Sequence, residues 1–160
     1  MSTQKYQGLG NITQLLTPTN LSAMTSNAVV TQSGSYNNTP GSGVGTGTGD
    51  GYVLARVTLI VTMNAGATAN TSFALWFLRS NDGGTTFERA PTSSIQYRAP
   101  DVVFTAPTDT TQTVICKDIL IPAGYFKASL CNNGTGQATK TDTTTAGTYL
   151  TIDPITVQTV

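Results

Sequence analysis

The chain has 160 residues, the length of one ordinary domain, and its eight basic and eight acidic residues cancel to a formal net charge of zero. This neutrality gives no general attraction to nucleic acid or to an anionic membrane, so we expect neither as a partner. The sequence contains no histidine, which excludes histidine-dependent catalytic triads and histidine-ligated metal sites. About one residue in five is threonine, and glycine, serine and asparagine are also abundant, a composition typical of β-strands and turns.

The first fifty residues differ in composition from the remainder. Residues 11–16 and 28–31 each predict a short strand, although residues 21–30 could instead form a short helix capped by Asn20. Residues 32–51 are almost entirely Ser, Gly, Asn, Thr and Pro, and such a stretch cannot bury enough apolar surface to order itself.

We therefore expect two parts, an extended N-terminal arm with a Gly/Ser/Thr-rich linker over residues 1–50 and a β-sandwich domain over residues 51–160. The glycine-rich centre of the linker lacks the Lys-Ser/Thr pair and the following helix that a phosphate-binding loop needs.

From residue 51 the pattern is that of strands. Residues 52–63 alternate between apolar and polar side chains, whereas residues 72–79 are apolar on both faces and predict a central strand that is covered on both sides. Further strands are predicted for residues 85–88, 95–97, 102–105, 113–121, 125–131, 135–138 and 148–157. Seven or eight strands at about ten-residue spacing predict an all-β fold, a two-sheet antiparallel β-sandwich or jelly roll.

The N-terminus lacks the pattern of a secretory signal, and no apolar run is long enough to span a bilayer. Cys116 and Cys131 are the only cysteines. They could pair if their strands were neighbours, but in a chain made in the cytosol we expect free thiols.

Residues 80–87 resemble the Asp-box hairpin of sialidase-like propeller blades, in which Ser-x-Asp-x-Gly-x-Thr is followed by an aromatic residue. We expect the Asp82 side chain to cap the amides of the turn, with Gly83 and Gly84 supplying its backbone freedom. A single copy without a blade repeat predicts a structural turn.

No residue pattern predicts catalysis, and we expect neither enzymatic activity nor a cofactor, metal or small-molecule substrate. The eight carboxylates are scattered and mostly lie beside turns, without the facing pair that a glycosidase requires. The loops at Asp82 and Asp142 offer oxygen ligands for calcium, but no EF-hand spacing is present. A sugar-stacking platform is possible if Trp76, Tyr97, Tyr125 and Tyr149 are exposed, whereas their positions inside alternating strands favour core or interface packing.

Several segments resemble a family of small virion proteins of tailed bacteriophages. Residues 75–88 resemble its hairpin, a strand followed by Ser-x-Asp-Gly-Thr and then an aromatic residue and Glu, and residues 100–104 match in the same order. Residues 119–138 resemble its Leu-Pro-Pro-Gly-x-Phe-Lys and Asn-Asn-x-Gly-Gln block, and residues 15–21 resemble its opening. The glycine-rich insertion at 41–49 and the run at 140–146 depart from the family pattern.

The resemblance implies a β-sandwich component of the virion, made in the host cytoplasm. We expect a capsid decoration (cement) protein on the capsid exterior that binds the major capsid protein, stabilises the assembled shell and forms a homotrimer. A flexible arm can order on a partner, and its apolar residues are the expected contacts: Leu15, Leu16, Leu21, Val29 and Val30. A minor tail or fibre component and a carbohydrate-binding receptor module are the alternatives.

Overall fold

The computed structural model describes residues 4–8, 12–39, 52–93 and 95–159. The elements in these ranges are β1 (Gln4–Gly8), β2 (Thr13–Leu16), α1 (Pro18–Leu21), β3 (Val29–Thr31), β4 (Tyr36–Asn38), β5 (Leu54–Val61), β6 (Ser72–Arg79), β7 (Val102–Thr105), β8 (Thr113–Leu120), β9 (Gly124–Asn133) and β10 (Tyr149–Thr159). The segments expected as strands at 85–88, 95–97 and 135–138 are not strands. The alternative helix over 21–30, capped by Asn20, is also absent from the described chain. The helix that forms there, α1, ends at Leu21, and its N-cap is Thr17.

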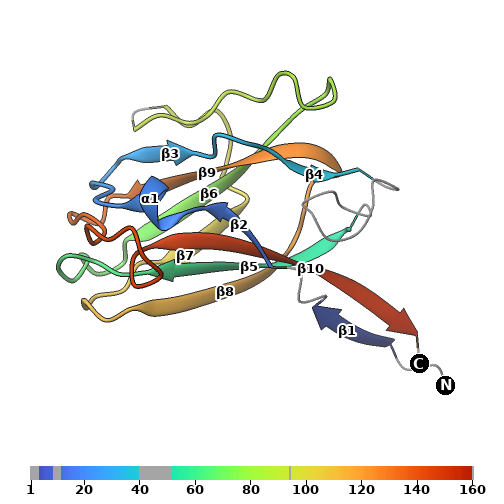
Figure 1. Ribbon diagram of the computed structural model, residues 1–160. Helices are drawn as coiled ribbons and strands as arrows, with labels where there is room; N and C mark the ends of the chain where they lie inside the picture. The colour runs from blue at the N-terminus through green and yellow to red at the C-terminus, as the bar shows by residue number, and fades with distance from the viewer. Residues whose placement is uncertain (1–3, 9–11, 40–51, 94, 160) are drawn as a thin grey trace.

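The strands form two antiparallel sheets (Figure 1). The first sheet has the order β1-β10-β5-β8, with β2 also pairing with β10. The second has the order β3-β9-β6-β7, with β4 also pairing with β9. The all-β sandwich predicted from the sequence is therefore confirmed.

The strand pairs are nested along the chain, which identifies the topology. Strands β1 and β2 pair with β10, β3 and β4 with β9, β5 with β8, and β6 with β7, so each pair encloses the next. The additional pairs β10·β5 and β9·β6 join this long folded hairpin into two sheets. This is the strand order of a jelly roll.

The core lies between the two sheets and follows the period of two that a strand imposes. Val57 and Leu59 from one sheet, and Phe73, Leu75 and Phe77 from the other, are completely buried in it. Strand β6 also has apolar residues on its other face, where Ala74, Trp76, Leu78 and Cys131 form a second, smaller cluster. Both faces of β6 are therefore covered, as its sequence predicts.

The N-terminal residues are part of the sandwich, contrary to the expected arm. Residues 13–16 pair with β10, and residues 29–31 and 36–38 pair with β9. Hydrogen bonds to residues 132–140 hold the connection between them, because buried Thr139 accepts from Met24 N and Asn132 Nδ2 donates to Met24 O. The boundary at residue 50 thus does not separate two structural units over residues 12–39, and most of the predicted linker lies outside the described residues.

Strand β1 is arranged differently. It pairs with the last residues of β10, from Ile155 to Thr159, and Figure 1 shows this two-stranded ribbon projecting from the body of the sandwich. This ribbon is the described part of the expected arm that extends beyond the body of the sandwich.

Candidate functional site

The segment from Ser80 to Asp101 crosses the outer face of the second sheet, where it carries a turn, a charged network and a pocket. Its Phe87 and Ala90 pack against the outer cluster around Trp76. The segment also lies along the edge of β6. Strand β7 has four residues and β6 has eight, so β7 pairs only with Ser72–Leu75. The remaining edge of β6 must satisfy its backbone polar groups in another way.

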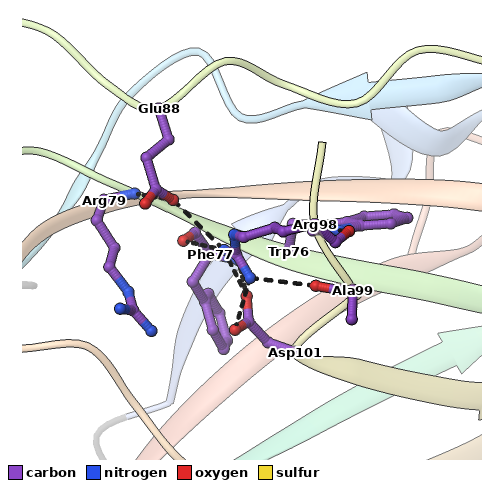
Figure 2. A network of polar contacts seen from close by, with 7 residues as sticks. All are labelled: Trp76, Phe77, Arg79, Glu88, Arg98, Ala99 and Asp101. Atoms are coloured by element: carbon purple, nitrogen blue, oxygen red, sulfur yellow. Dashed lines mark hydrogen bonds and ion pairs between the residues drawn. The ribbon is translucent and has the colours of Figure 1, made fainter. Parts of the chain in front are cut away.

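Side chains take the place of the missing strand at Phe77. Its backbone N–H donates to Asp101 Oδ2 at 2.7 Å, and its carbonyl oxygen accepts from Arg98 Nη2 at 2.9 Å (Figure 2). Arg98 and Asp101 also form a two-pronged ion pair, with both N–O distances at 2.9 Å. The two charged groups therefore bind the same peptide edge and each other.

Glu88 continues this pairing along the same edge of β6. Its backbone N–H donates to Arg79 O at 2.9 Å, and its Oε2 accepts from Arg79 N at 3.2 Å. The same Oε2 lies 3.4 Å from Arg98 Nη2. We call Glu88, Arg98 and Asp101 the edge clamp, because together they close the edge of β6 from Phe77 to Arg79.

Arg98 is the centre of the edge clamp. Its backbone oxygen also accepts from Trp76 Nε1 at 3.1 Å, which satisfies the polar atom of a side chain that is 1% exposed. The hydrogen bonds to Asp101 are the main reason why the pKa of Arg98 is raised above its ordinary value, with burial opposing them and the charges of Asp101 and Glu88 adding to them. Arg98 therefore stays charged, and its contacts with Trp76, Phe77 and Asp101 fix its position.

The turn at Asp82 is held by its carboxylate, which caps the amides of the turn as the sequence predicts. Asp82 Oδ1 accepts from Thr85 N, Thr86 N and Ser80 Oγ, and Oδ2 accepts from Thr86 Oγ1. These hydrogen bonds, led by those from Thr86, lower the pKa of Asp82 to about 2. Gly83 and Gly84 have φ values of 70° and 90°, in the region that favours glycine. The carboxylate is thus used within its own turn.

A pocket of about 300 Å³ lies beside the edge clamp and is lined by Glu88, Arg89, Tyr97 and Arg98. The Arg89 guanidinium lies 5.0 Å from the centre of the Tyr97 ring, and Tyr97 is 47% exposed. A second pocket of about 290 Å³ is lined by Met63, Asn64, Thr110 and Lys140. Only the first combines an exposed aromatic ring with two guanidinium groups among the described residues.

The apolar residues expected to contact the capsid lie in the chain's own interior. Leu15, Leu16 and Leu21 are 2% exposed or less and belong to the main core. Val30 is partly buried against the main core and Val29 against the outer cluster. Their side chains complete the sandwich, because β2 and β3 are strands of it, so the folded chain does not offer the leucines to a partner.

The four aromatic residues considered as a sugar platform are not brought together. Trp76 is buried under the segment 80–101, and Tyr149 belongs to β10 in the opposite sheet. The Tyr125 ring packs against Gly84, where a Cβ atom would meet it at 2.8 Å. Tyr97 is the one of the four that lines a pocket in the described chain.

The cysteines and the carboxylates are dispersed over the described part of the chain. No group of three or more Cys, Asp or Glu side chains there could hold a metal ion. Cys116 is exposed on β8 and Cys131 is buried on β9 in the other sheet, and both are free. The free thiols expected from the sequence are therefore confirmed, and burial raises the pKa of Cys131.

Comparisons with protein-family models, with curated proteins and with solved structures find no match to this chain. Among the described residues, no helix has the length and apolar character needed to cross a membrane.

Proposed function

We propose that this chain is a non-enzymatic structural protein of a tailed-phage virion, a capsid decoration protein that binds the outside of the assembled shell. The observation that carries the proposal is the agreement between the resembling motifs and the turns of a jelly roll. The motif at 80–87 forms the turn after β6, and those at 119–127 and 130–138 surround Gly124 and Gly134, which both have positive φ. The jelly roll is a fold of viral capsid domains, and of lectins and cupins as well.

The surface best suited to the shell is the outer face of the sheet β1-β10-β5-β8. The segment 80–101 covers the other sheet, whereas none of the described helices and strands is drawn over the outer face of β5 and β8 in Figure 1. Cross-strand pairs on this face include Thr58 with Cys116 and Ile60 with Val114, of which Ile60 is 7% exposed and Val114 61% exposed. Arg56 on this face binds Asp118 through two hydrogen bonds of 2.8 and 3.0 Å, and Asp153 lies opposite Arg56 on β10.

Decoration would stabilise the shell by mass action, since a ligand that binds only the assembled state favours that state. Repetition over a symmetric shell supplies avidity beyond that of a single 160-residue chain. A homotrimer placed at local threefold axes remains the proposed arrangement, with the major capsid protein as the partner.

The test is co-sedimentation of the purified chain with expanded capsids that lack it, with tails as the parallel sample. Val114 on the proposed face is 61% exposed, and Val103 on β7 of the other sheet is 50% exposed. We expect Val114→Glu to weaken capsid binding at least tenfold and Val103→Glu to leave it unchanged. Saturable binding in a fixed ratio to the major capsid protein supports decoration, and a threefold count supports the trimer.

Binding to tails alone would replace decoration by the role of a minor tail component. Binding to neither particle would contradict the proposal. Equal losses in Val114→Glu and Val103→Glu would contradict the assignment of the contact face while leaving decoration in place.

A further inference from the structure

The pocket beside the edge clamp has one cation, Arg89, without an ion pair among the described residues. Arg98 is paired with Asp101 and Glu88, whereas Arg89 has no ion pair with any described residue and contacts only the Tyr97 ring as a cation. A guanidinium group presents a planar fork of donors that matches a carboxylate. The pocket therefore has an open site for an anionic group.

Glu88 and Tyr97 line the same pocket and add a hydrogen-bond acceptor and an aromatic ring to the guanidinium group of Arg89. The hydrogen bonds and ion pairs of Glu88 within the described chain use Oε2 and the backbone, which leaves Oε1 open as an acceptor on a side chain that is 40% exposed. Tyr97 offers an exposed aromatic surface. An acceptor, an apolar ring and a carboxylate-binding fork suit a ligand that combines hydroxyl groups, C–H surface and a carboxylate.

We propose that this pocket binds an acidic sugar unit, with the sugar carboxylate on Arg89, a hydroxyl group on Glu88 and the ring against Tyr97. The cavity of about 300 Å³ has room for a single sugar ring. Two of the four lining residues are held before binding, because the edge clamp fixes Glu88 and Arg98 on β6 through the contacts with Arg79 and Phe77. Preorganisation of this kind lowers the cost of binding.

The experiment is an NMR titration of the isotope-labelled full chain with glucuronate and N-acetylneuraminate, and with glucose and acetate as comparison ligands. We expect at least one acidic sugar to shift the amide signals of residues 88–98 saturably, and glucose and acetate to bind at least tenfold more weakly. Arg89→Gln should weaken the binding at least tenfold. Arg79→Gln is the matched control, because Arg79 has no ion pair in the described chain and its side chain points away from the edge clamp in Figure 2.

Unchanged binding by Arg89→Gln would overturn the assignment, provided that the variant keeps the wild-type spectrum elsewhere. Equal affinity for acetate and the acidic sugars would show a general carboxylate site, such as one for a peptide terminus, and would also overturn it. The absence of saturable shifts with both acidic sugars would do the same. The titration uses no capsids, so its result is independent of the decoration proposal.

Discussion

Replacing Asp101 with alanine tests the role of the edge clamp in holding the outer segment on β6. The change removes the acceptor for Phe77 N and one side of the ion pair with Arg98. Phe77 is fully buried, so its N–H cannot gain a full replacement from water without local opening. A buried donor left without a partner costs about 1–3 kcal/mol, and a partly exposed ion pair adds up to about 1 kcal/mol. We therefore expect Asp101→Ala to lower the free energy of unfolding by about 1–4 kcal/mol.

Urea denaturation followed by tryptophan fluorescence measures this loss, because Trp76 is the only tryptophan and donates to Arg98 O. Asp101→Asn is the informative companion, since an amide oxygen can still accept from Phe77 N while the charge is lost. Its expected cost is about 1 kcal/mol. In a double-mutant cycle, Arg98→Ala and Asp101→Ala should be less than additive, because they share the interaction. A loss below about 0.5 kcal/mol in Asp101→Ala would refute the reasoning.

Two further predictions concern the other hydrogen-bonded connections. Thr139→Val should lower the free energy of unfolding by about 1–3 kcal/mol, because it leaves Met24 N and Leu21 O without their buried partner. The control is Thr141→Val at an exposed position, which should change the free energy of unfolding by less than about 0.5 kcal/mol in urea denaturation. Asp82 should titrate with a midpoint of about 2 in carboxyl NMR. Because its pKa is lowered on folding, its contribution to stability is present above the usual value of 3.8 and is lost as the pH falls toward 2. Thr86→Val should raise the midpoint, and an unchanged value would contradict the assigned cause.

The sequence predicts the strands well where local pattern and tertiary environment agree. Strand β6 is apolar on both faces because the core lies on one side and the segment 80–101 on the other, and its predicted bounds, 72–79, match the structure. The short strands expected within 11–16 and 28–31 are confirmed, but their place in the sandwich was not predicted. Residues 29–31 find their partners in residues 129–131, and the local pattern of a strand does not show with which distant segment it pairs. The polar composition of residues 32–51 then favoured an arm.

The edge clamp was missed for a similar reason. Its groups come together because β7 is shorter than β6 and pairs with only one end of it. The sequence predicts both strands with the correct bounds, 72–79 and 102–105, but it does not show that they are neighbours or in which register they pair. The strand expected at 85–88 is absent because Glu88 satisfies the edge of β6 with its side chain as well as its backbone. A signal was nonetheless present. In a chain with 10% charged residues, five lie between Glu88 and Asp101 or directly before the turn at Arg79: Arg79, Glu88, Arg89, Arg98 and Asp101.

Several of the described sheet edges are poorly suited to the addition of a strand from another chain, which bears on how a partner would bind. The edge clamp closes β6, and β3 and β4 have three residues each. The longer edge of β8 carries Lys117, which pairs with core residue Val57 and thus lies on the inward face of the sheet. An inward-facing charge on an edge strand opposes sheet extension. Association through a face is therefore favoured over association through an edge, and the uncovered outer face of β5 and β8 is where the capsid proposal places it.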